Sequence, residues 1–132
     1  MYFWLLWFYF QTDKPNRPSG PLNVTDITAD HVKLTWQAPE FDGGSRITSY
    51  LIEKSEARRP KWLRVQRVGA NETECELDNL VENTDYFFRV LAENKMGLSA
   101  PLESDKTVKP VSPFGKKSMA VFGYYVLFNL VY

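Results

Sequence analysis

The pattern that decides the fold of this chain lies in residues 80–94, LVENTDYFFRVLAEN. From Tyr86 onward, aromatic and β-branched residues recur at every second position, and a period of two indicates a strand. Its inward-facing side chains are expected to be Tyr86, Phe88 and Val90, because alternate residues of a strand point to the same face. The run before the strand, residues 82–85, is rich in residues that favour turns.

This layout is that of a tyrosine corner, and Leu80 stands six residues before the tyrosine. In such a corner the tyrosine ring lies inside, and its hydroxyl bonds to the backbone just upstream, which holds the crossing between two sheets. An immunoglobulin domain has a cysteine two residues after this tyrosine, whereas this chain has Phe88. The pattern predicts an all-β, immunoglobulin-like sandwich without a disulfide between its sheets.

Six further stretches with strand-like composition bring the expected number of strands to seven. They are residues 22–28, 31–37, 46–54, 61–68, 72–77 and 100–108, the last interrupted by Pro101. The phase of residues 61–68 is ambiguous, because Trp62 and Val65 cannot share a face without a bulge. The predicted structural core consists of Trp36, Tyr50, Leu80, Tyr86, Phe88 and Val90.

The domain is expected to occupy residues 18–110 and to fold with the stability of the whole chain. Prolines 15, 18 and 21 favour an extended linker before it, so residues 1–17 are assigned to an apolar segment and this linker. Residues 111–132 are assigned to a second linker and an apolar tail. Both apolar ends are shorter than the roughly 20 residues of a transmembrane helix, so a membrane role is not expected. Residues 1–10 are interpreted as a gene-model extension in preference to a targeting segment.

Composition and motifs give no support for an enzyme. The net charge is +0, which favours neither nucleic acid nor an anionic membrane. Cys75 is the only cysteine and is expected to be a buried small hydrophobe, and His31 is the only histidine, so no metal site is expected. No catalytic motif, cofactor site or small-molecule substrate site is found in the sequence.

A set of residues distributed over about 18–110 matches a known family. It comprises Trp36, Ala38-Pro39, Asp42-Gly43-Gly44-Ser45, Ile47, Tyr50, Ile52-Glu53-Lys54, Trp62, Leu80, Tyr86, Arg89-Val90, Ala92-Glu93-Asn94 and Gly97-Leu98-Ser99-Ala100-Pro101. With these residues the chain resembles the fibronectin type III domains, above all those of titin- and twitchin-like giant muscle proteins. The resemblance implies a non-catalytic link of a sarcomeric thick-filament scaffold in the cytoplasm. It also implies neighbouring immunoglobulin and fibronectin type III domains as partners, with myosin and the thick filament as further partners.

A second hypothesis is an extracellular adhesion or receptor fibronectin type III domain with an apolar targeting or anchoring end. It would need a cleavable signal or a longer membrane segment than the sequence contains. Terminal sequencing and glycan analysis of the native protein distinguish the two hypotheses.

The partner-binding residues are expected on the outer face of the sheet that holds the third, fourth and sixth strands. Alternation places Leu51, Phe87 and Leu91 there, with Arg89 among them, and an exposed apolar patch rimmed by charge is typical of an interface. The alternative is that lysine and arginine stems cover this patch.

Two groups of like charge are also expected on the surface, and they could orient neighbouring modules or partners. The acidic group is Glu72, Glu74 and Glu76, and the basic group is Arg58, Arg59, Lys61, Arg64 and Arg67.

Overall fold

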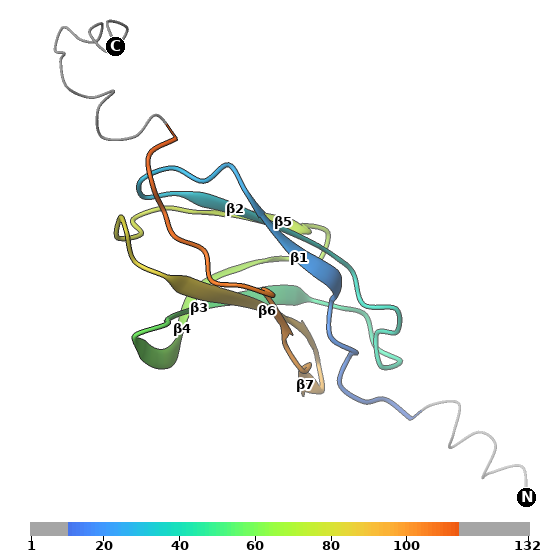
Figure 1. The fold of residues 1–132 in the computed structure, drawn as a ribbon. Coiled ribbons are helices and arrows are strands. Elements are labelled where there is room, and N and C mark those ends of the chain that lie inside the picture. The colour runs from blue at the N-terminus through green and yellow to red at the C-terminus, as the bar shows by residue number, and fades with distance from the viewer. Residues whose placement is uncertain (1–10, 114–132) are drawn as a thin grey trace, which may run out of the picture.

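Two antiparallel sheets pack face to face in the computed structural model, which describes residues 11–113 (Figure 1). The predicted apolar ends, 1–10 and 114–132, lie outside the described residues. The strands are β1 (Ser19–Thr25), β2 (Val32–Gln37), β3 (Ser49–Glu56), β4 (Arg59–Gly69), β5 (Glu74–Leu77), β6 (Tyr86–Asn94), β7 (Gly97–Leu98) and β8 (Leu102–Glu103).

The smaller sheet has the strand order β1-β2-β5, and the larger has the order β4-β3-β6-β7, with β8 also paired to β6. The chain enters one end of the sandwich near residue 11 and leaves the opposite end near residue 113 (Figure 1). The described residues form strands, turns and loops only. The prediction of an all-β, immunoglobulin-like sandwich is confirmed.

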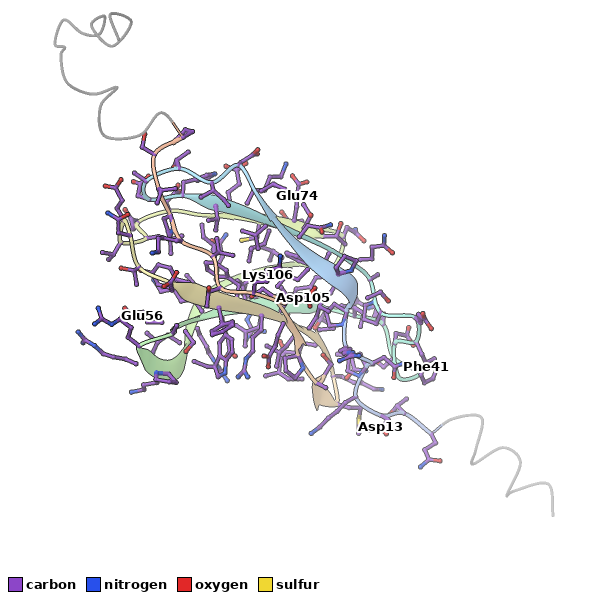
Figure 2. All side chains as sticks on the ribbon, viewed as in Figure 1. Asp13, Phe41, Glu56, Glu74, Asp105 and Lys106 are labelled. Carbon is purple, nitrogen blue, oxygen red and sulfur yellow. The ribbon has the colours of Figure 1, made fainter. Side chains whose placement is uncertain are left out.

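The core lies between the two sheets, where side chains from both fill the space (Figure 2). The six predicted core residues, Trp36, Tyr50, Leu80, Tyr86, Phe88 and Val90, are all buried. The Trp36 and Tyr50 rings meet edge to face with centroids 5.5 Å apart, and they come from β2 and β3, which belong to different sheets. The alternation of side chains along each strand therefore determines which of them point into the core between the two sheets.

The tyrosine corner is formed as expected. The amide of Val81 donates a hydrogen bond to the Tyr86 hydroxyl, with a length of 3.0 Å. Asn83, inside the turn, has a φ of 65°, which asparagine tolerates better than most residues, and its amide bonds to the Pro110 carbonyl at 2.9 Å. The corner thus holds the crossing between the sheets and the segment by which the chain leaves the sandwich.

The last predicted strand, residues 100–108, is divided in the structure. It appears as β8 and an isolated bridge between Tyr86 and Val108, while the short β7 precedes it. Pro101 lacks an amide hydrogen, and two serine hydroxyls take over part of the pairing with β6. The hydroxyl of Ser99 accepts from the Ala92 amide at 2.9 Å, and that of Ser104 accepts from the Phe88 amide at 3.1 Å. The described residues thus contain eight strands, because the short β7 pairs with the end of β6 in addition to the seven expected.

A β-bulge resolves the ambiguous phase of the fourth strand. Ile52 is opposite Gln66, while the next residue, Glu53, is opposite Arg64, so Val65 is the extra residue. Val65 packs against the core, whereas Trp62 lies over Arg89 on the outer face. The first strand also differs from its prediction, because it begins at Ser19, which pairs with Gln37.

Tyr86→Phe tests the corner. We expect it to lower the free energy of unfolding by about 1–3 kcal/mol, because the Val81 amide loses its partner. Tyr50→Phe is the matched control, since the described part of the chain shows no hydrogen bond to the Tyr50 hydroxyl. The measurement is chemical denaturation of the full chain, and an equal, small loss in both variants would contradict the role assigned to the corner.

Candidate functional site

The outer face of the larger sheet carries all four residues predicted to bind a partner, but two of them are not exposed. Leu51 and Leu91 are opposite each other on β3 and β6, and they are only 3% and 8% exposed. Phe87 and Arg89 are half-buried. The expectation of an exposed apolar patch is therefore wrong for the two leucines, and the structure supports the alternative of a covered face.

Two rows of charged side chains cross this face from one strand to another. In the first row, the Arg67 guanidinium on β4 pairs with the Glu93 carboxylate on β6 and also donates to the Ser49 hydroxyl at 3.1 Å. Since β3 lies between β4 and β6, the Arg67 side chain passes over it beside Leu51, its opposite residue. The stem of a long arginine covers apolar surface while its charged group stays in contact with water.

The second row is centred on Glu53, a carboxylate that is 7% exposed. The Arg89 Nε atom donates to it at 2.6 Å, and the Arg64 Nε atom lies 3.8 Å away. Arg89 also stacks on the Trp62 ring, with its guanidinium carbon 4.2 Å from the ring centroid. Both rows together present a surface of half-buried aromatic and guanidinium groups, typical of protein contact sites.

Trp62 is a component of this surface that the sequence did not assign to it. The bulge at Val65 sets the phase of Trp62, and only the pairing of β3 with β4 reveals the bulge. A partner role for Leu51, Phe87, Arg89 and Leu91 stays a prediction.

A second candidate site lies where the chain enters the sandwich, and we call it the linker dock. It consists of residues 11–16, the turn at residues 42–45, and Asn94. The Asp13 amide bonds to the Gly43 carbonyl at 2.8 Å, and the Asn16 amide bonds to the Phe41 carbonyl at 3.0 Å. Asp13 and Phe41 lie at this end of the molecule in Figure 2.

Asn94, at the end of β6, joins the parts of the linker dock. Its side-chain amide donates to the Asp13 carbonyl at 2.7 Å and to the Asp42 carbonyl at 2.8 Å. Its side-chain oxygen accepts from the Met96 amide at 2.8 Å. Asn94 is 3% exposed, so its loss would leave several buried polar groups without partners.

The turn at residues 42–45 needs its glycines for two reasons. Gly43 and Gly44 have φ angles of 83° and 87°, in the left-handed region that favours glycine. A Cβ at Gly43 would also collide with the main-chain oxygens of Asp13 and Lys14. The sequence predicted the turn, whereas the structure shows that its glycines also make room for the linker.

The linker dock includes residues that precede the predicted domain boundary at residue 18. Pro15 is buried, and residues 13 and 16 are hydrogen bonded to the sandwich. Residues 11–17 are therefore more than a spacer, and we expect stability to fall when they are removed, contrary to the expectation from sequence.

His31 lies near the sheet of β1, β2 and β5 among carboxylates. Its Nδ1 atom is 2.8 Å from Asp78, and its Nε2 atom is 3.6 Å from Glu76. The hydrogen bond to Asp78 raises the pKa of His31, and the charges of Asp78, Glu76 and Asp26 act in the same direction. No cluster of metal-binding side chains occurs within residues 11–113.

Cys75 is buried, as predicted. Burial raises the pKa of its thiol to about 11, with Glu72 and Glu76 adding to the effect, so the reactive thiolate is disfavoured. Across the described range, we find no helix with the length and hydrophobicity needed to cross a membrane.

Comparison with known proteins identifies the family. The family model of the fibronectin type III domain matches residues 16–106. This chain belongs to the fibronectin type III family. The result confirms the resemblance found in the sequence.

Several of the similar proteins are titins and myosin-binding proteins C. Titin of Drosophila melanogaster is 40% identical over 87 residues, which is 66% of this chain and, after rounding, 0% of titin. Fast-type myosin-binding protein C of Gallus gallus is 31% identical over 83% of this chain and 10% of its own length. The chain thus spans only a small part of these relatives.

Solved structures show the same relationship. Domains A168-A170 of titin are 42% identical with a TM-score of 0.71, over 76% of this chain and 34% of that one. The twitchin kinase region of Caenorhabditis elegans is 34% identical with a TM-score of 0.70, over 78% of this chain and 18% of that one.

Asn94→Ala tests the linker dock. In the full chain we expect it to lower the free energy of unfolding by about 1–3 kcal/mol, because buried carbonyl and amide groups lose their partner. In a chain that starts at residue 18 the loss should shrink by about 0.5 kcal/mol or more, because Asp13 is already absent. The exposed Asn71→Ala is the control, with an expected effect within about 0.5 kcal/mol. An equal cost of Asn94→Ala in both chains would show that the linker contact is not energetically coupled to Asn94.

His31 makes stability depend on pH. Its folded pKa lies above the ordinary value of 6.5, so its contribution is fully present below that value and is lost as pH rises through the folded pKa. We expect His31→Gln to cost more stability near pH 5.5 than near pH 8.5. In the single variant Asp78→Asn, stability should depend less on pH over this range than in the parent. Melting curves of the three proteins across this range check it, and a cost independent of pH would refute it.

Proposed function

We propose that this chain is a non-catalytic structural and protein-binding module, one link of a titin- or twitchin-like sarcomeric thick-filament scaffold. The observation that carries the proposal is the linker dock, in which main-chain and side-chain hydrogen bonds hold residues 13–16 against the sandwich. A module in a chain of modules needs a defined joint to be oriented relative to its neighbours, because a flexible linker leaves the relative orientation free.

The placement of entry and exit supports the same role. Residues 11 and 113 lie at opposite ends of the sandwich, so modules before and after this one would follow its long axis (Figure 1). The segment near the exit is held too, because the Pro110 carbonyl accepts from the Asn83 amide. Neighbouring immunoglobulin and fibronectin type III domains are therefore the first partners that we propose.

Myosin in the thick filament is the second partner that we propose, with a cytoplasmic, sarcomeric location. Support comes from the similarity to myosin-binding protein C and to titin. The contact surface that we propose is the outer face of β3, β4 and β6, where Phe87, Trp62 and Arg89 are partly accessible. Aromatic residues and arginine are enriched among the residues that dominate binding energies.

Co-sedimentation with reconstituted myosin filaments tests this function. We expect the full chain to bind, and Phe87→Ser to weaken binding by about tenfold or more, as for truncation of a central interface aromatic. Phe41→Ser makes the same chemical change at a residue that is 57% exposed at the entry end, and it should bind as the parent does. Thermal melts confirm that both variants are folded.

Absence of binding by the full chain would refute the myosin proposal. Equal binding by the parent, Phe87→Ser and Phe41→Ser would instead refute the proposed surface.

A further inference from the structure

The hairpin of β3 and β4 carries an excess of positive charge in a chain whose net charge is +0. Residues 53–67 contain six lysines and arginines and two glutamates, a net charge of +4. Arg58, Arg59 and Lys61 are exposed, and among residues 11–113 none of the three has a carboxylate within 4.0 Å. In contrast, Arg64 and Arg67 are paired with Glu53 and Glu93.

Within residues 11–113, the acidic part of the chain forms no ion pair with this hairpin. Residues 71–85 contain six acidic residues and no lysine or arginine. The ion pairs that these acids form in the described region are with Lys33 and His31, on the smaller sheet. The cations of the hairpin are therefore available to a carboxylate from another molecule.

The strand at the same place has an outer edge without a strand partner in the described residues, where the Lys61 amide donates inward to the Ser55 hydroxyl at 3.0 Å. β4 is the outermost strand of its sheet, and in the described part of the chain it pairs only with β3. Pro60, a second register shift between Arg59 and Leu63, and the bulge at Val65 make this edge short and irregular, so it offers a partner only residues 61–64. Leu63, in this short edge, is 48% exposed, so an apolar contact is available between the charges.

A hollow beside the turn of the hairpin limits the chemistry of the partner. Its lining includes Arg58, Arg59 and Lys109, and also the carboxylates of Glu56 and Asp85. The two carboxylates would repel a dense polyanion such as nucleic acid or a sulfated polysaccharide. A peptide with spaced carboxylates and apolar residues fits the mixture of charges, the exposed leucine and the free strand edge.

We propose that the β3–β4 hairpin binds an extended acidic segment of another protein. The segment lies along residues 61–64, with its carboxylates at Arg58, Arg59 and Lys61 and an apolar side chain on Leu63. Short strand addition supplies the alignment, and the charges supply the specificity and a fast association. The two proposed surfaces share Trp62, but Arg58, Arg59, Lys61 and Leu63 are not among the residues proposed to contact myosin, so variants at these four positions test this proposal separately.

A labelled peptide of alternating glutamate and valine, with a glutamine-for-glutamate peptide as its control, tests the proposal on the full chain. We expect only the acidic peptide to bind, with affinity falling between about 0.1 and about 1 M salt, where the Debye length drops from about 10 to about 3 Å. The triple variant Arg58→Ala, Arg59→Ala, Lys61→Ala should lose at least about tenfold in affinity.

Two controls locate the site. The variant Arg46→Ala, Lys95→Ala, Lys106→Ala removes the same charge from exposed positions elsewhere and should retain the parental affinity. Leu63→Ser should weaken binding by about threefold, whereas Val81→Ser, at a residue that is 60% exposed, should not.

Equal loss in the two triple variants would overturn the proposal, as would parental affinity in the hairpin variant. Heparin that binds more tightly than the peptide and depends on the same three residues would also overturn it, because the site would then select polyanions. Salt-sensitive self-association that is lost in the hairpin variant, without peptide binding, would assign the surface to a second copy of the chain and refute a separate partner.

Discussion

The hydrogen bond from the Val81 amide to the Tyr86 hydroxyl is the constraint on which the rest of the structure depends. It holds the chain where it crosses from β5 in the smaller sheet to β6 in the larger one. β6 then takes part in three features of the structure: the core, the pairing with β7 and β8, and the charged rows of the outer face. Its inner side chains build the core, its edge binds β7 and β8, and its outer side chains join the charged rows. At its far end, Asn94 receives the linker.

The outer face of the larger sheet shows how charge and burial work together. The Arg67 and Arg64 guanidiniums are exposed, and ion pairs with an exposed partner are worth only about 0–1 kcal/mol each, so these pairs are not what stabilises the sandwich. Their effect is to cover Leu51 and Leu91 with side chains that keep their charged groups in water. A face covered in this way keeps its charges in water while the stacked Trp62 and Arg89 side chains stay partly accessible.

The segments at both ends of the sandwich are hydrogen bonded to it and are not free spacers. Segments at both entry and exit donate or accept main-chain hydrogen bonds, through Asp13 and Asn16 at one end and Pro110 at the other. The glycines of the turn at residues 42–45 are required by the main chain and by the passage of the linker above it. The direction in which the chain enters and leaves the sandwich is thus set by contacts within the described residues.

Short-range pattern in the sequence determined the fold class, the six core residues and the tyrosine corner. The reason is that strand alternation and turn preferences act over two to six residues, so one stretch such as 80–94 displays them directly. It also predicted that Cys75 is buried and that the face of Leu51 and Phe87 is an outer one. These inferences need only the phase of a strand.

Tertiary structure alone decided how deeply that face is covered, where Trp62 points, how the final strand divides and where the linker lies. Burial of Leu51 and Leu91 depends on side chains from β4 and β6, and the phase of Trp62 depends on a bulge in the β3–β4 pairing. The contact between Asn94 and Asp13 joins residues 81 positions apart. No local pattern encodes such contacts, because they arise only when the sheets have assembled.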